Sequence, residues 1–291
     1  MTTLINRKKP ISSKKPKKKI TGRKVTLTIS GWIIGLLFLS PYVEMMITSV
    51  KSKSEILSIP TTYLPQHWTW SNYITIWKQL PLAQYLRTSI VVSLSATILV
   101  LLLAIPAAYY VGRNKFKGRT AFLLLVLVTQ MFSPTSLVIG IFREVIKFHL
   151  VNTWMALILV YAAFNMAFSI WILSSFFASI PIDIEEAAWI DGASRIQALR
   201  QVVLPIALPG LVTAFIFTFI SAWNEFVIAL TIESSPAHQP LTVGLESLIG
   251  QYQVQWQYLF AGSLIAIVPV VILFALIEKW LVSGLTAGSV K

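Results

Sequence analysis

Charged residues are absent from six long stretches of the chain, which are residues 25–43, 88–112, 120–142, 150–182, 201–224 and 247–277. A transmembrane α-helix needs about 20 mostly apolar residues to cross about 30 Å of hydrocarbon. The fourth and sixth stretches exceed that length, so each also contains interfacial or loop sequence. Pro134 falls inside the third stretch, where a helix bundle tolerates it if neighbouring groups satisfy the freed carbonyl oxygens. We therefore predict an all-α integral membrane protein with six transmembrane helices.

The composition supports a membrane protein. Hydrophobic residues make up 56% of the 291 residues and charged residues only 12%, whereas about a quarter of the residues in ordinary globular domains are charged. A soluble chain of this length would need far more polar surface to cover its core. The chain contains no cysteine, which excludes disulfides, thiolate metal sites and cysteine nucleophiles.

Positive charge gathers at the beginning of the chain. Ten of the 24 Lys and Arg residues lie in residues 1–24, a segment without any acidic residue. We predict that this segment is a disordered basic cytoplasmic tail beside anionic lipid headgroups; a nucleic-acid-binding arm is the alternative. The apolar stretch that follows is longer than a signal-peptide core and has no A-x-A-like site, so we expect a retained span.

The Lys and Arg residues outside the spans predict the orientation. With the N-terminus inside, the inner segments carry 18 of them and the outer segments six, a bias that predicts cytoplasmic N- and C-termini. The outer segment 51–87 includes the aromatic residues Trp68, Trp70, Tyr73 and Trp77. We interpret them as an interfacial aromatic belt, with a docking surface for an external partner as the alternative.

The inner segment between the fourth and fifth stretches carries the densest charge in the body of the chain, in Asp183, Glu185, Glu186, Asp191, Arg195 and Arg200. The pattern predicts two helices joined by a turn. We expect Asp183 to cap the first helix, Gly192 to end it in a left-handed turn and Ser194 to cap the second. Such a helix pair on the inner face can dock into the groove of a soluble partner.

One motif in this segment consists of Glu185, Glu186, Ala187, Ala188, Asp191, Gly192, Leu204 and Pro205. It resembles the EAA motif of binding-protein-dependent ABC permeases, in the form found in the carbohydrate-importer family. The resemblance extends to Trp223-Asn224-Glu225-Phe226, which is similar to a fifth-span signature of that family. Residues 284–291 are similar to the end of the G-type permeases of maltose transporters.

The resemblance implies a permease subunit of an ATP-driven, binding-protein-dependent importer. Such a protein passes a sugar or oligosaccharide across a bacterial cytoplasmic (inner) membrane by alternating access. The implied partners are a second permease in a heterodimer, two ATP-binding subunits, an extracytoplasmic solute-binding protein, the sugar and membrane lipid, and not nucleic acid. The motif would couple to one ATPase subunit, and a C-terminal tail at 284–291 would reach between the two. The transmembrane domain would occupy residues 25–283.

The sequence offers little for catalysis. It lacks G-x-x-x-x-G-K-[ST], so we expect no P-loop in this chain, no cofactor or metal, and ATP bound only by the partner subunits. Glu185 and Glu186 point about 100° apart on a helix, which argues against shared acid–base work. We expect a permease rather than a membrane-embedded enzyme, and a permease for a non-sugar solute is the other alternative. We expect Asn224 and Glu225 on the translocation pathway; for Glu225 the alternatives are a structural hydrogen bond to a neighbouring helix or exposure at the outer boundary.

Overall fold

The computed structural model describes residues 22–287, with side chains described from 26 to 278. Within that range the chain is helical, and its one isolated bridge, between Ile249 and Val254, belongs to no strand. The chain divides into two compact units, Met1–Glu44 and Met45–Lys291. Helix α1 (Gly22–Ser49) begins in the first unit, and its last turns belong to the second.

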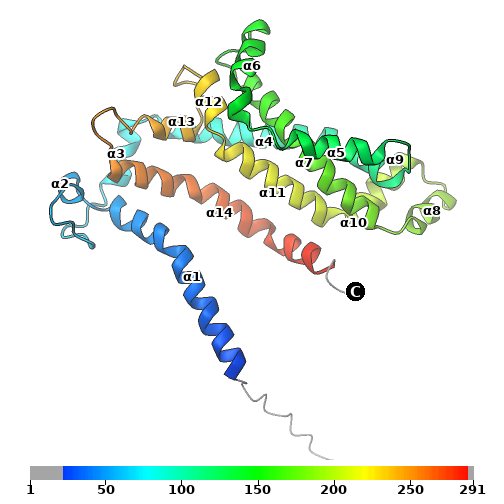
Figure 1. Cartoon of the computed structure of the whole chain (residues 1–291), viewed down its shortest axis with the longest axis horizontal. Coiled ribbons are helices and arrows are strands. Elements are labelled where there is room, and N and C mark those ends of the chain that lie inside the picture. Colours follow the sequence, from blue (N-terminus) through cyan, green and yellow to red (C-terminus); the bar gives the residue numbers. More distant parts are fainter. Residues whose placement is uncertain (1–21, 288–291) are drawn as a thin grey trace, which may run out of the picture. The chain divides into compact units, whose positions relative to one another are not determined.

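The second unit is built around four long helices (Figure 1), which are α4 (Leu82–Arg113), α7 (Trp154–Ser179), α11 (Leu208–Asn224) and α14 (Trp256–Ala287). Helices α4 and α7 pack closely because small residues line their contact. At Gly112 of α4, a Cβ atom would lie 2.9 Å from the carbonyl oxygen of Ser174 in α7, so a larger residue there would push the two helices apart. Ser169 of α7 and Thr218 of α11 share a hydrogen bond of 3.0 Å in the same core.

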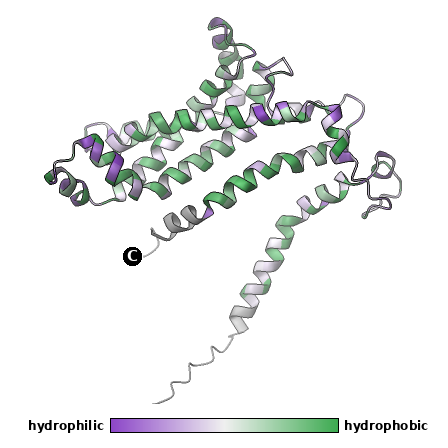
Figure 2. Ribbon diagram, turned by 180° about the vertical axis from the view of Figure 1, so that it is seen from behind, coloured by the Kyte–Doolittle hydropathy of each residue, from purple (hydrophilic) through white to green (hydrophobic). Residues whose placement is uncertain are grey.

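Shorter helices lie at both ends of this bundle. One end, the α13 end, carries α2 (Lys53–Ile56), α3 (Asn72–Gln79), α12 (Val227–Ile232) and α13 (Leu241–Glu246). The opposite end, the α8 end, carries α8 (Asp183–Ile190), α9 (Arg195–Ala198), the π-helix η1 (Leu199–Val203) and α10 (Leu204–Ile206). Figure 2 shows the long helices as mostly hydrophobic, whereas hydrophilic residues gather towards the ends of the bundle.

Four helices are long and apolar enough to cross a membrane, namely Thr26–Ser49, Leu82–Arg113, Trp154–Ser179 and Trp256–Glu278. Two further pairs qualify only if each bent pair counts as one span. These pairs are α5 (Arg119–Thr129) with α6 (Pro134–Lys147), bent by 92°, and Arg195–Ile206 with α11, bent by 77°. The part of the chain that the structure describes therefore holds four to six candidate spans.

Two of the six stretches predicted as spans, 120–142 and 201–224, contain a sharp bend and are not single straight helices. Pro134 does not lie inside a helix but opens α6, and Ser133 before it is extended, with ψ of 133°. Proline disfavours helical backbone at the residue before it, which explains the break at this position. The second break, at Ala207, is flanked by Pro205 and Pro209, neither of which has an N–H to donate to a continuous helix.

At the α13 end, hydrogen bonds hold a long loop in place. The side-chain amide of the buried Asn72 donates to the backbone oxygens of Ser49 (2.8 Å) and Lys51 (2.9 Å). In the same loop, the rings of Trp68 and Trp70 are exposed and stack with centroids 6.0 Å apart. The loop is therefore ordered by polar contacts and leaves two of its aromatic rings on the surface, in the segment where an interfacial belt is predicted.

Glu233, directly after α12, is a fully buried acid. Among the described residues, neither of its carboxylate oxygens makes a hydrogen bond of normal geometry. Burial raises the pKa of this carboxyl group to about 7, although the backbone amide of Thr153 acts in the opposite direction. Loss of solvation disfavours the charged form of a buried acid, so Glu233 lowers the free energy of unfolding at pH values where it is ionised.

We predict that Glu233→Gln stabilises the protein at pH 8 but not at pH 4.5. The pKa of Glu233 in the folded state lies above the usual 4.5, so the folded state binds the proton more tightly and stability falls as pH rises from about 4.5 to about 7. Glutamine removes that loss, and we expect a gain on the order of 2 kcal/mol at pH 8. Thermal unfolding in detergent measures it, with Glu144→Gln, at an exposed acid, as the control. An equal gain at both pH values would contradict the prediction.

Candidate functional site

Local sequence signals determine where α8 begins and ends. Asp183, Glu185 and Glu186 fill the first turn of α8, where negative charge complements the helix dipole. The expected cap by Asp183 is wrong, because Ile182 is the cap residue of α8 and it makes no side-chain cap hydrogen bond. Gly192 ends the helix as predicted, with φ of +89°, a conformation that favours glycine.

The second helix of the corner begins as the sequence predicts. The Ser194 hydroxyl accepts a hydrogen bond from the backbone amide of Gln197 (3.3 Å). The side-chain oxygen of Gln197 accepts one from the backbone amide of Ser194 (2.8 Å). This reciprocal pair is a capping box, which fixes where the helix starts. The helix then runs through η1 and α10, where Leu204 is half-buried and Pro205 exposed, before the bend at Ala207.

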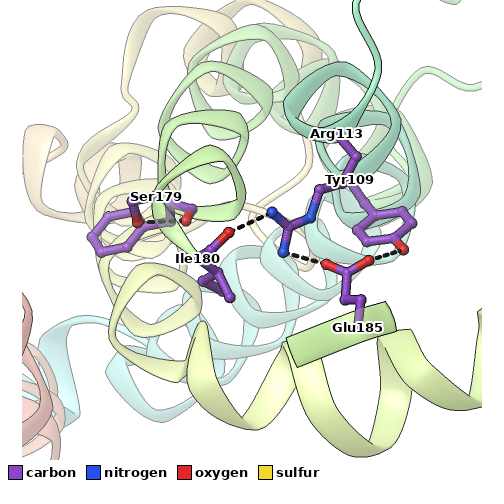
Figure 3. A network of polar contacts seen from close by, with 6 residues as sticks. Tyr109, Arg113, Ser179, Ile180 and Glu185 are labelled. Carbon is purple, nitrogen blue, oxygen red and sulfur yellow. Dashed lines mark hydrogen bonds and ion pairs between the residues drawn. The ribbon is translucent and has the colours of Figure 1, made fainter. Parts of the chain in front are cut away.

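Glu185 points into the protein (Figure 3). One carboxylate oxygen accepts a hydrogen bond of 2.7 Å from the Tyr109 hydroxyl, and the other forms an ion pair with the Arg113 guanidinium. A second nitrogen of Arg113 donates to the backbone oxygen of Ile180 (2.6 Å), the residue that ends α7. This group of contacts, which we call the Glu185 clamp, joins α8 to the ends of both α4 and α7.

The other side of the corner faces outwards. Glu186 and Asp191 are exposed, and so are two large apolar side chains, Ile190 (85% exposed) and Ile196 (77%). We call the exposed side of α8 and α9 the α8–α9 surface. A notch of about 380 Å³ opens on it, lined by Ala188, Asp191, Gly192, Ala193, Gln197, Gln201 and Val202. Next to it, the Arg195 guanidinium lies 5.8 Å from the ring centre of Trp189.

The motif residues therefore divide between two roles. Glu185 is turned inwards and neutralised, whereas the adjacent Glu186 is exposed, so the two carboxylates do not share one site. Among the described residues, no group of three or more His, Asp and Glu side chains gathers as metal ligands would. The arrangement is suited to binding a partner on the α8–α9 surface and to holding α8 firmly from behind.

The pathway candidates Asn224 and Glu225 lie at the junction of α11 and α12. Both oxygens of Glu225 are engaged, accepting from the backbone amides of Ile228 (2.8 Å) and Ala229 (3.1 Å) and from the Tyr161 hydroxyl (2.9 Å). Glu225 thus caps the first turn of α12 and ties it to α7, as the structural alternative predicted. Asn224, the last residue of α11, is exposed.

Tyr109 and Arg113 were not singled out from the sequence. The available signal was their spacing, because residues four apart lie on the same face of a helix. The predicted C-terminal tail at 284–291 lies outside the residues whose side chains are described, and so does the whole basic segment 1–24.

Known proteins resemble this chain along nearly its whole length. It is 38% identical to the sulfoquinovosyl glycerol transport system permease protein SmoH of Agrobacterium fabrum, over 87% of this chain and 89% of that protein. It is 36% identical to the inner membrane ABC transporter permease protein YcjP of Escherichia coli, over 92% and 98%. It is 34% identical to the trehalose/maltose transport system permease protein MalG of Thermococcus litoralis, over 92% and 97%.

A solved structure supports the fold. A chain of a bacterial ABC transporter involved in the import of the acidic polysaccharide alginate matches with a TM-score of 0.75 and 22% identity, over 91% of this chain and 99% of that chain. The model of the family described as "Binding-protein-dependent transport system inner membrane component" matches residues 101–286, which include α8, α9 and the Glu185 clamp. Since that match covers more than half of the chain and relatives above 30% identity cover nearly all of it, the chain belongs to the family of binding-protein-dependent transport system inner membrane components.

Proposed function

We propose that this chain is the permease subunit of an ATP-driven importer that carries a sugar or oligosaccharide across a bacterial cytoplasmic membrane by alternating access. Several of its relatives carry a solute in their names, namely sulfoquinovosyl glycerol, trehalose and maltose, and diacetylchitobiose, all of which are saccharides or glycosides. The observation that carries the proposal is the α8–α9 surface, which presents the EAA motif on a helix whose only buried side chain is Glu185.

The α8–α9 surface fits a soluble ATPase subunit. Ile190 and Ile196 are large apolar side chains exposed on the short helical segments at one end of the bundle. Exposed acids, Glu186 and Asp191, border them and give the surface a polar rim. A short helix that lays such a face into a groove is a recurring mode of recognition. We therefore assign ATPase coupling to the residues predicted for it. Glu185 contributes from inside the protein, where it holds α8 in place.

The remaining organisation follows from the same proposal. We assign six spans by counting each bent pair as one, and place both termini, the basic segment 1–24 and the tail 284–291 in the cytoplasm. The α8 end then faces the cytoplasm, where ATP is available, and the α13 end faces the solute-binding protein. A second permease completes a heterodimer, and a second ATPase subunit pairs with the first. The bias of Lys and Arg towards the inner segments supports this orientation.

We also assign Asn224 and Glu225 to the border of the translocation pathway. The bond between Glu225 and Tyr161 fixes the junction of α11 and α12, and the exposed amide of Asn224 stands beside it. A side-chain amide both donates and accepts hydrogen bonds, which suits the hydroxyl groups of a sugar. In this assignment, Glu225 fixes the junction of α11 and α12, and the side-chain amide of Asn224 contacts the solute.

The importer assignment is tested with the complete transporter in liposomes. We expect its ATP hydrolysis to rise when the solute-binding protein is loaded with one member of a saccharide panel, and we expect that saccharide to accumulate inside. Amino acids, short peptides and glycerol phosphates serve as the comparison set. Stimulation by a member of that set, with none by any saccharide, would contradict the sugar assignment.

Glu186→Lys is expected to weaken binding of the ATPase subunits at least about tenfold, which is 1.4 kcal/mol or more. The substitution reverses the charge of an exposed residue on the α8–α9 surface and leaves the Glu185 clamp untouched. Co-purification of the ATPase subunits with the permease measures the effect. Glu144→Lys makes the same change at an exposed acid outside this surface. Equal ATPase recovery from both variants would show that Glu186 lies outside the interface.

Glu225→Ala is expected to lower the stability of the permease by about 2–4 kcal/mol, because it leaves two backbone amides of α12 and the Tyr161 hydroxyl without their acceptor. Asn224→Ala should leave the unfolding temperature within about 1 °C and raise the apparent KM for import. Thermal unfolding and initial uptake rates separate the two effects. If Asn224→Ala left import unchanged at every sugar concentration, the pathway assignment of Asn224 would be wrong.

A further inference from the structure

Helix α8 is attached to the bundle in an unusual way. Of its eight residues, Glu185 is the only one whose side chain is buried, and every contact recorded for its carboxylate comes from α4, through Tyr109 and Arg113. Of the large apolar residues of α8, Ile184 and Ile190 are exposed and Trp189 is half-buried, so none is fully buried. A charged side chain therefore occupies the place where an amphipathic helix normally buries an apolar one.

Stability alone does not explain this choice. An eight-residue helix is too short to persist without tertiary contacts, so α8 needs an attachment. A buried ion pair is a poor means of gaining stability, because apolar residues of similar volume often do as well or better. What the pair provides is direction, because hydrogen bonds and ion pairs fix both distance and angle. Apolar packing holds surfaces together with far less directional preference.

The groups that hold Glu185 are themselves held firmly. Tyr109 packs edge-on against Phe177 of α7, with ring centres 5.9 Å apart. One helical position before Arg113, Gly112 lets α4 approach α7 so closely that a Cβ atom there would lie 3.0 Å from the Cβ of Phe177. Arg113 also binds the backbone oxygen of Ile180, at the end of α7. The clamp thus connects α8 to two helices that pack closely against each other.

We propose that Tyr109 and Arg113 are positioning residues that make α8 move as one rigid body with the cytoplasmic ends of α4 and α7. The proposal rests on the proposed function, in which an ATPase subunit binds the α8–α9 surface. When that subunit moves α8, the clamp carries the displacement into two long helices of the bundle that pack against each other. Without the clamp, the ATPase still binds and hydrolyses ATP. However, α8 turns or slides against the bundle, and part of its displacement does not reach α4 and α7.

Coupling is measured as the number of sugar molecules imported per ATP hydrolysed by the complete transporter in liposomes. Glu185→Gln keeps the shape of the side chain and an oxygen for Tyr109 but removes the charge that Arg113 binds. We expect the ratio to fall at least fivefold in this variant and about twofold in Tyr109→Phe, which keeps the ion pair. The ATPase subunits should still co-purify with both variants.

The chain offers a matched control. Glu144 and Lys147 form an exposed ion pair with 3.8 Å between the charged atoms, outside the α8–α9 surface. Glu144→Gln therefore removes one charge from an ion pair that the clamp does not include, and the sugar-to-ATP ratio should stay unchanged. A wild-type ratio in Tyr109→Phe and in Glu185→Gln would overturn the proposal. If the Glu185→Gln complex does not assemble, the ratio in Tyr109→Phe decides alone.

A distance measurement tests rigidity directly. Because the chain has no cysteine, spin labels can be placed at Leu103→Cys on α4 and Asp183→Cys on α8, both exposed sites. In the complete transporter, we expect the same distance between the labels with and without ATP, and an ATP-dependent change only when Glu185→Gln is added. An ATP-dependent change with the clamp intact would overturn the proposal. A wild-type transporter that imports no saccharide would instead count against the proposed function, independently of the clamp.

Discussion

The ion pair between Glu185 and Arg113 is the contact on which the α8 end of the molecule depends. A carboxylate removed from water needs a partner of opposite charge and further hydrogen bonds, and here α4 supplies both through Arg113 and Tyr109. Because that partner sits on a long packed helix, the requirement to neutralise one charge also fixes the position of α8. The outer side of α8 is thereby left free, with Ile190 and Glu186 exposed.

Carboxylates removed from water are stabilised in different ways at the two ends of the bundle. At the α8 end, an acid is paired with a base. At the junction of α11 and α12, Glu225 is satisfied by backbone amides and one hydroxyl, as a helix cap requires. Glu233 has neither solution, and its raised pKa reflects that deficit. In a chain with so few acids, Glu185, Glu225 and Glu233 mark an attachment, a helix cap and a buried carboxyl group with a raised pKa.

The bends in the helices also have a functional consequence. The bend at Ala207 lets the helical segment that begins at Arg195 leave the α8–α9 surface and join α11 at an angle of 77°. The corner and the core helix are therefore continuous in the chain, while the Glu185 clamp joins the same corner to α4 and α7. The Glu185 clamp thus adds an electrostatic connection to the covalent ones that link the α8–α9 surface to the bundle.

Much of this organisation is determined by the sequence itself, because it depends on local or compositional signals. Charge-free stretches predict apolar helices, Gly192 and the Ser194–Gln197 box set the ends of α8 and α9, and the spaced motif identifies the family. Only the tertiary structure decided which of two adjacent glutamates is buried, since both lie in the same turn and differ only by the helix face that meets α4. The same holds for Tyr109 and Arg113, 76 and 72 residues before Glu185 in the sequence. Their role arises from packing between distant segments, which no local pattern encodes.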